Sequence, residues 1–149
     1  MMSGQHRQQE TVQPALPRNL AARSIGALLS VAISVIHVID QGGFPGSVTP
    51  PYVGILFYVL EFAGIVTAIL LLAGFVGLGW FLALGISAGP LVCYLFSRGT
   101  GLPGYGDDIG NWLEPLGILS LVVEAGLFVL AAAMLKSLVR PGKVRTAGG

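Results

Sequence analysis

The chain has 149 residues, of which 54% are hydrophobic and only 10% are charged. Soluble proteins average about 25% charged residues, so this composition predicts a single-domain integral membrane protein. The net charge of +1 provides no basic field, which excludes a nucleic-acid-binding protein. The single cysteine, Cys93, excludes an internal disulfide or a thiolate cluster. Because it stands in an apolar run, we expect it to be a small buried side chain.

The N-terminal part divides into a polar tail and a first spanning helix. Residues 1–19 are polar and contain two prolines, which predicts a disordered cytoplasmic tail. The following run, 20–40, is apolar apart from Arg23, His37 and the terminal Asp40. At about 1.5 Å per residue it is long enough for the ~30 Å hydrocarbon layer. A cleaved signal peptide is the alternative, but the run ends in DQGGF and lacks a small-x-small cleavage pattern.

The middle of the chain is too long and too apolar to be one helix. After a Gly/Pro-rich segment, Thr49 followed by Pro50 predicts a helix N-cap and first position. Residues 52–97 contain Glu61 as their only acidic residue, and as one helix they would span about 69 Å, twice the membrane. We therefore predict a reversal in GFVGLG, residues 74–79, with helices at about 52–73 and 77–97. Pro90 should kink the second of these.

A Gly-rich polar loop separates these helices from the last one. Asn111 and Glu114 have the spacing of a capping box, with Pro115 in the first helical turn. This predicts a helix at about 111–136, followed by a basic cytoplasmic tail at 139–149. The predicted fold is an all-α bundle of four transmembrane helices within residues 20–138. Basic residues cluster at both chain ends, so both termini should be cytoplasmic in the cell membrane, with the longer loops outside.

Helical spacing places the polar residues of each predicted helix on one face. Counting from the outer helix ends puts one polar residue per helix roughly 15–20 Å deep, namely Ser30, Glu61, Ser87 and Glu124. A second layer lies nearer the outer surface and contains His37, Tyr94, Arg98 and Glu114, with Asp40 above it. Together these residues predict a polar funnel open to the outside. Further supporting polar residues on the same faces are Ser34, Tyr58 and Ser120.

Two interpretations of the deep layer follow. Glu61 and Glu124 are expected to face one another, either protonated and bonded to serines as interhelical contacts or forming a proton or cation site. For Arg98 we expect a salt bridge to Glu114 or an aspartate, with a headgroup or anion site as the alternative. His37 is either a hydrogen-bonded histidine at a helix end or a metal ligand with nearby carboxylates.

Other patterns bear on assembly and chemistry. Gly85 and Gly89 have the spacing of a close helix contact, within the bundle or between protomers of a homo-oligomer. No zincin motif, P-loop, GxSxG or CxxC occurs, so no cofactor and no catalytic nucleophile is indicated. An enzyme acting on lipid or quinone is therefore the least supported class.

The sequence SRGTGLPG, followed by NWLEPLGILS and Glu124, resembles a pattern in small bacterial four-helix membrane proteins of unassigned function. The resemblance covers mainly residues 97–124, and this chain has Gly99 where the pattern more often has threonine. It implies the four-helix architecture and no biochemical activity.

Two functions remain open from the sequence. The first is a membrane protein that binds or conducts a proton, metal ion or other small cation through an outward-facing polar funnel. Its candidate site residues are Glu61, Glu124, His37, Glu114, Arg98 and Asp40. The second is a structural accessory subunit of a larger membrane complex, in which the polar interior only fixes the packing. The expected surroundings in both cases are membrane lipid.

Overall fold

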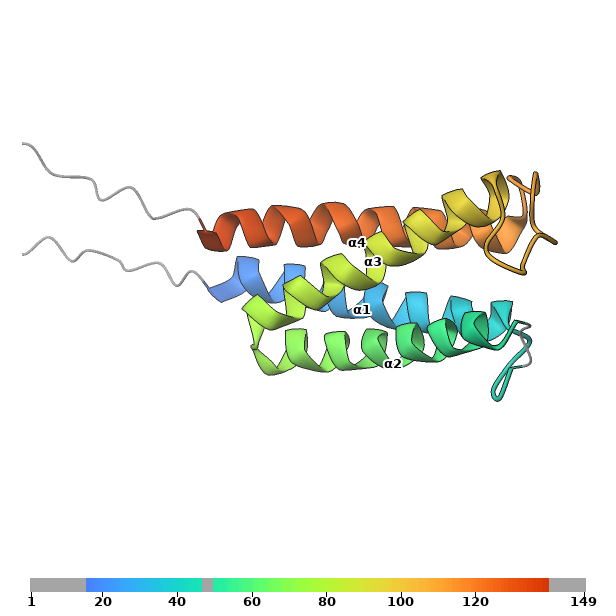
Figure 1. The fold of residues 1–149 in the computed structure, drawn as a ribbon. Helices are drawn as coiled ribbons and strands as arrows, with labels where there is room; N and C mark the ends of the chain where they lie inside the picture. Colours follow the sequence, from blue (N-terminus) through green and yellow to red (C-terminus); the bar gives the residue numbers. More distant parts are fainter. Residues whose placement is uncertain (1–15, 47–49, 140–149) are drawn as a thin grey trace, which may run out of the picture.

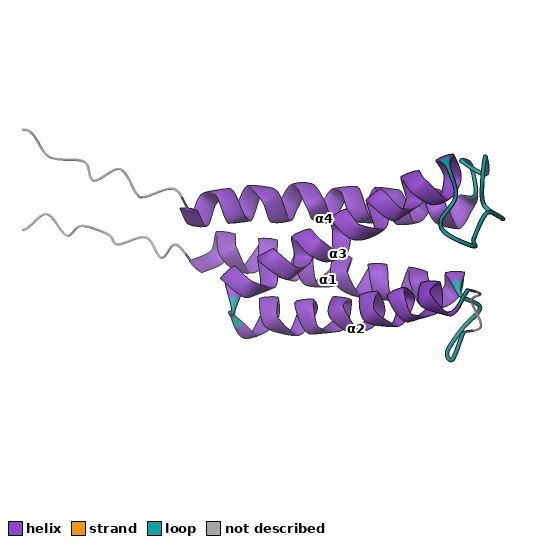
Figure 2. Cartoon of the chain, viewed as in Figure 1, coloured by secondary structure: helices purple, strands orange, loops and turns teal. Residues whose placement is uncertain are grey.

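The computed structural model describes residues 16–46 and 50–139. Its regular elements are four α-helices, α1 (Leu16–Asp40), α2 (Pro51–Ala73), α3 (Val76–Gly99) and α4 (Pro115–Val139). Figure 2 shows loops between them, and one isolated bridge pairs Leu102 with Tyr105. All four helices are long and apolar enough to cross a membrane, which confirms the predicted all-α fold. α1 begins at Leu16, so the last residues of the segment 1–19, predicted as a tail, are helical instead. The rest of that segment, Thr49 and residues 140–149 lie outside the described residues.

The helices run alternately up and down in one bundle. Figure 1 places the start of α1, the end of α4 and the α2–α3 turn at one end, here called the terminal end. The loop segments 41–46 and 100–114 lie at the opposite, loop end. α1 packs mainly against α2 and α4, while α3 crosses from beside α2 at the terminal end to beside α4 at the loop end. The crossing separates α2 from α3 at the loop end.

The reversal between α2 and α3 is where the sequence predicted it. α2 ends at Ala73, and Gly74 has a φ of +94°, a left-handed conformation that glycine adopts without a Cβ penalty. The amide of Phe75 donates to the carbonyl of Leu70 at 3.0 Å, closing the helix end. Arg23 of α1 donates to the carbonyls of Leu71 and Leu72, each at 2.6 Å. This residue, which interrupts the first apolar run of the sequence, thus ties α1 to the end of α2.

The start of α4 differs from the prediction. The helix begins at Pro115 rather than near Asn111. Proline disfavours helical geometry in the residue before it, so a helix cannot readily run through Glu114 into Pro115. Glu114 instead accepts hydrogen bonds from the amides of Leu116 at 3.0 Å and Gly117 at 2.6 Å. Glu114, and not Asn111, is therefore the residue whose side chain caps the helix.

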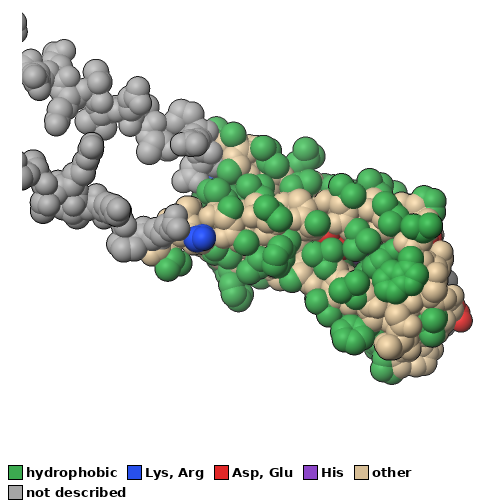
Figure 3. All heavy atoms as spheres, turned by 90° about the horizontal axis from the view of Figure 1, so that it is seen from above, with side chains coloured by type: hydrophobic (Ala, Val, Ile, Leu, Met, Phe, Trp, Pro, Cys, Tyr) green, Lys and Arg blue, Asp and Glu red, His purple; other side chains and the backbone are tan. Residues whose placement is uncertain are grey.

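The interior combines an apolar core with the predicted polar stripes. Trp80, Leu71, Ile33 and Leu127 are fully buried. The surface is mostly apolar along its length, as Figure 3 shows, with a basic side chain at the terminal end and acidic ones toward the loop end. The buried polar residues are Ser30, Ser34, His37, Gln41, Glu61, Thr67, Ser87, Ser97, Arg98, Ser120 and Glu124. An apolar exterior around polar buried groups suits a protein surrounded by lipid.

Glycines lie at the close helix contacts, but these glycines are Gly26 and Gly64 rather than the predicted Gly85 and Gly89. A Cβ at Gly64 of α2 would lie 2.8 Å from the carbonyl oxygen of Ser30, and a Cβ at Gly26 of α1 would lie 2.6 Å from the Trp80 ring. Gly85 and Gly89 are exposed, and a Cβ at either would meet nothing within 4 Å. A packing role for this pair within the described chain is therefore wrong. Cys93, one turn further along α3, is also exposed rather than buried.

Candidate functional site

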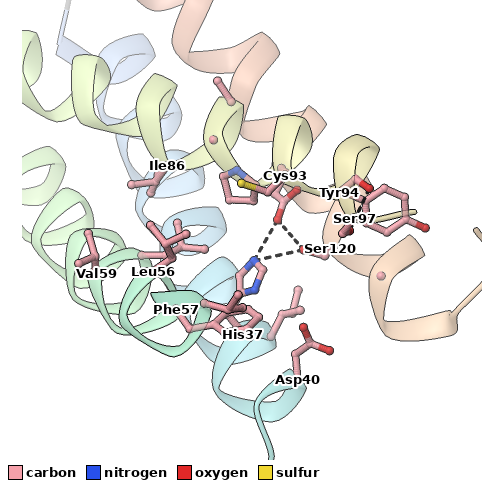
Figure 4. Close-up of a pocket in the computed structure, with 18 of the residues that line it drawn as sticks. His37, Asp40, Leu56, Phe57, Val59, Ile86, Cys93, Tyr94, Ser97 and Ser120 are labelled. Carbon is pink, nitrogen blue, oxygen red and sulfur yellow. Dashed lines mark hydrogen bonds and ion pairs between the residues drawn. The ribbon is translucent and has the colours of Figure 1, made fainter. Parts of the chain in front are cut away.

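A histidine, a glutamate and a serine from two helices form a buried cluster near the loop end. His37 Nε2 lies 3.1 Å from Glu124 Oε1, and the hydroxyl of Ser120 donates to the same oxygen at 2.5 Å. Glu124 is only 1% exposed and His37 is 9% exposed. Figure 4 shows the imidazole pointing toward these contacts, drawn as dashed lines. We call these three residues the His37 cluster.

Local sequence explains how the His37 cluster forms. Ser120 and Glu124 are one helical turn apart on α4, so both side chains point to the same neighbour. His37 lies in the last turn of α1, the helix that packs against α4. The ring of Phe57 on α2 lies against the imidazole, with centroids 5.3 Å apart. The imidazole is thus held between the carboxyl group of Glu124 and the ring of Phe57.

The protonation of the imidazole follows from its neighbours. A carboxylate accepts hydrogen bonds only, so the proton shared with Glu124 in the ionised state belongs on Nε2. In the neutral imidazole this leaves Nδ1 as a hydrogen-bond acceptor. Nδ1 is buried and has no partner among the described residues. Both hydrogen bonds to Glu124 end on Oε1, which leaves Oε2 without one in the same part of the chain.

A second charged group lies closer to the loop end. Arg98, 8% exposed, makes an ion pair with Asp108, and its Nη2 lies 3.8 Å from Glu114 Oε2. The Tyr94 ring lies 5.0 Å from the guanidinium carbon, and its hydroxyl donates to the carbonyl of Trp112 at 2.8 Å. The predicted salt bridge of Arg98 to Glu114 or an aspartate is confirmed. It ties the end of α3 to the loop and to the start of α4.

The other deep glutamate has different partners. Glu61 Oε1 accepts a hydrogen bond from Gln41 Nε2 at 2.7 Å, and Ser34 donates to the Glu61 backbone carbonyl at 2.9 Å. Glu61, 8% exposed, lines a surface pocket formed by residues of α1, of α2 and of the loop that joins them. We call Ser34, Gln41 and Glu61 the Glu61 cluster.

The predicted facing of Glu61 and Glu124 is not found, since they have different partners and line different pockets. Glu124 meets His37, which the sequence had placed in the shallower layer. The late start of α4 accounts for much of this. Beginning at Pro115 rather than 111 brings Glu124 four residues, or about 6 Å, nearer the loop end.

The remaining supporting residues serve local structure. Ser30 donates to the carbonyl of Gly26 and Ser87 to that of Ala83, each at 2.8 Å and each within its own helix. Such bonds satisfy a buried hydroxyl without a partner helix. Tyr58 donates to the carbonyl of Gly46 at 3.2 Å. These side chains do not reach either glutamate, so the predicted layer at one depth is not a single site.

The His37 cluster forms part of the wall of a cavity of about 890 Å³. Asp40, Arg98, Asp108 and Glu114 line the same cavity. It therefore brings together every predicted candidate site residue except Glu61. Its other walls are apolar residues of α2 and α3, of which Leu56, Val59 and Phe81 are more than half exposed. The cavity thus continues from buried polar groups to the apolar surface between α2 and α3.

Tyr105, in the loop, also lines this cavity. Burial and the neighbouring Asp108 carboxylate raise the pKa of its phenol to about 12. Both effects disfavour the tyrosinate, because it loses hydration and gains a like-charged neighbour. Tyr105 therefore stays neutral over the physiological range.

Sequence reasoning left several of these residues out of the candidate set. Gln41 follows the first predicted helix and was not a candidate, and the aspartate expected to pair with Arg98 was not identified as Asp108. Phe57 and Cys93 gave no signal, because aromatic and small residues are common in apolar helices. Their position on the cavity depends on how α2 and α3 are rotated and separated.

No group of three or more His, Cys, Asp or Glu side chains placed to hold a metal ion occurs in residues 16–46 and 50–139. Comparison with protein-family models, curated proteins and solved structures finds no match to the chain. The proposals below therefore rest on the geometry of the site itself.

Proposed function

We propose that this chain is a multi-pass protein of the cell membrane that binds a proton, or another small cation, at the His37 cluster. The supporting observation is the contact of 3.1 Å between His37 Nε2 and Glu124 Oε1 in the wall of a cavity. Burying one ionised side chain within a membrane costs roughly 2.5–3.5 kcal/mol on insertion scales. A titratable base beside the buried acid allows the pair to gain or lose a proton at a lower cost.

The charged groups above the His37 cluster support access from the loop end. Asp40 lines the cavity close to the end of α1, and Asp108 and Glu114 line it beside Arg98. These carboxylates give a cation or a hydrated proton a sequence of polar positions between the loop end and Glu124. Whether the cation is only bound or is also conducted is decided by the flux measurement below.

The test compares the two buried glutamates, because each can be replaced by an amide of the same size. In infrared spectra of the purified protein, a carboxyl band that changes with pH should be present in the parent and lost in Glu124→Gln. Glu61→Gln is the matched control and should keep this band. If no pH-dependent band disappears in Glu124→Gln, the proton site is refuted.

Conduction is measured on the same variants in proteoliposomes. With an imposed pH gradient and an enclosed pH-sensitive dye, conduction predicts that the parent collapses the gradient faster than protein-free vesicles. Glu124→Gln should then slow the collapse roughly tenfold, as the loss of one charged interaction implies. A parent that leaves the gradient unchanged would restrict the function to binding.

For topology, we propose that both termini are cytoplasmic and that the loop end faces outside, from the distribution of basic residues. A Cys93→Ser background removes the native thiol. In intact cells, Asp107→Cys should react with an impermeant thiol reagent and Ser137→Cys should not. Labelling of Ser137→Cys alone would reverse the orientation.

The alternative is an accessory subunit of a larger membrane complex or a homo-oligomer. The observation that favours it is the exposed position of Gly85 and Gly89 on α3, where no part of the described chain covers them. The mass of the purified particle in mild detergent tests this. A particle heavier than the monomer that returns to monomer mass in Gly85→Leu would support it.

A further inference from the structure

The cavity that contains the His37 cluster has two chemically different parts. Its polar part lies between α1, α4 and the loop end, and includes His37, Glu124 and Arg98. Its apolar part lies between α2 and α3, with Leu56 and Val59 on one side and Phe81 on the other. Figure 4 shows Leu56 and Val59 on the α2 ribbon and Cys93 and Tyr94 on α3, on opposite sides of the imidazole. A bare proton requires no apolar part of this size.

The apolar part opens toward the surface that lipid would cover. Leu56, Val59 and Phe81 are 52%, 60% and 65% exposed although they line the cavity. Gly85 and Gly89, also in the lining, lack side chains that would close the gap. At about 890 Å³, the volume lies in the range that holds a small organic molecule. A ligand could therefore reach the polar part sideways, from within the bilayer.

The polar part has an excess of negative charge. Four carboxyl groups line the cavity, those of Asp40, Asp108, Glu114 and Glu124, against one guanidinium and one imidazole. Even with His37 protonated and Glu124 neutral, carboxylates outnumber cations. This balance disfavours an anionic headgroup and favours a cation.

A buried acceptor without a hydrogen-bond partner in the described residues also favours a cationic ligand over an anionic one. His37 Nδ1 is buried without a partner among the described residues, and beside an ionised Glu124 it is an acceptor in the neutral imidazole. Arg98 Nε is a buried donor that likewise has no partner in the part of the chain that the structure describes, but its guanidinium already faces the carboxylates of Asp108 and Glu114. Aromatic rings complete the lining, with Phe57 beside the imidazole and Phe81, Tyr94 and Tyr105 elsewhere. Ring faces attract organic cations.

We infer that the cavity binds an amphiphilic organic cation, with the charge near Glu124 and the apolar part between α2 and α3. This inference rests on the proposed function, because it takes Glu124 as the group that binds the cation. It adds the substrate class and the route of access. A neutral amphiphile, such as a quinone, is the competing occupant that the test below separates.

The probe is tetraphenylphosphonium, a cation with an apolar surface, and tetraphenylborate is its anionic counterpart of closely similar shape. Binding is measured by equilibrium dialysis against the purified full-length chain in detergent, with protein-free micelles as baseline. The parent should bind the cation saturably and should not bind the anion saturably. Glu124→Gln should weaken binding roughly tenfold, as expected when one charge pair is lost.

A second pair of variants tests the route between α2 and α3. Gly89→Leu places a side chain in the cavity and should weaken cation binding roughly tenfold, about as much as Glu124→Gln does. Gly126→Leu is the matched control, since Gly126 is also exposed, has nothing within 4 Å and does not line the cavity. It should bind like the parent, as should Glu61→Gln.

Equal binding of both tetraphenyl ions, or cation binding that Gly89→Leu and Glu124→Gln leave unchanged, would overturn the inference. So would saturable binding of decylubiquinone in a protein that does not bind the cation. The two proposals fail separately. A carboxyl band of Glu124 that titrates, without cation binding, removes only the organic-cation inference. Loss of both signals removes the proton site as well.

Discussion

The bundle has a closed side between α1 and α2 and an open side between α2 and α3, and each is associated with one buried glutamate. On the closed side, the helices meet at Gly64 and Glu61 is bonded to Gln41. On the open side, α3 has crossed toward α4, and Glu124 and His37 face the cavity left behind. The two glutamates are buried to similar extents. Burial alone therefore does not identify a site, since a site also needs a titratable partner: Glu124 contacts His37, whereas Glu61 is bonded to the amide of Gln41.

The largest expected effect is on stability, and it compares a leucine introduced on the closed side with one introduced on the open side. Gly64→Leu should destabilise the fold by about 3 kcal/mol, because its side chain would overlap Ser34 and the carbonyl of Ser30. A Cβ at Gly85 would meet nothing within 4 Å, so Gly85→Leu should not destabilise the fold. The measurement is the unfolding midpoint in mixed detergent. Equal midpoints for the two variants would mean that the closed side is not closely packed.

The next effect concerns the Glu61 cluster. Glu61→Ala leaves the buried Gln41 amide without its acceptor and should cost about 1–3 kcal/mol of unfolding free energy. Glu61→Gln retains a hydrogen-bonding amide oxygen and should lie within about 1 kcal/mol of the parent. A double-mutant cycle with Gln41→Ala measures the coupling between the two side chains. A coupling energy of zero would show that the hydrogen bond contributes nothing to the closed side.

Arg23 gives a somewhat smaller effect at the terminal end of the closed side. Its two hydrogen bonds satisfy carbonyls in the last turn of α2, where a cation is also favoured by the helix dipole. Arg23→Met keeps the apolar stem, loses these donors and should cost about 1 kcal/mol. The unfolding midpoint is again the measurement, with Arg23→Lys as a partial rescue. If Arg23→Met matches the parent, the carbonyls find equivalent donors elsewhere.

The smallest effect tests the loop above the open side. Because the pKa of Tyr105 is raised to about 12, its phenol should ionise near pH 12 rather than near the ordinary value of about 10. The folded state then holds a proton that the unfolded state loses. The contribution of Tyr105 to the free energy of unfolding is therefore constant below about pH 10 and is lost as the pH rises toward 12. The difference in tyrosinate absorbance between the parent and Tyr105→Phe measures this, and a difference centred near pH 10 would mean that the loop leaves Tyr105 open to water.

Several features of this protein followed from the amino-acid sequence by itself. Hydrophobic runs gave the four helices, and the length limit of a membrane span located the turn at Gly74. Helical periodicity found the polar stripes, because a period of 3.6 residues assigns each side chain to a face whatever the partner is. The pairing of Arg98 with Glu114 and an acidic loop residue was predictable because charged groups near a membrane seek opposite charges.

Only the tertiary structure decided which glutamate meets which partner. Glu124 reaches His37 because α4 starts at Pro115 and packs against α1, while Glu61 turns to Gln41 on the other side of the bundle. The cavity exists because α3 crosses from α2 to α4, which also leaves Gly85 and Gly89 uncovered. Periodicity and residue counting fix a position along and around one helix, but they carry no information on how helices cross. The crossing is set by side-chain packing between segments far apart in the sequence.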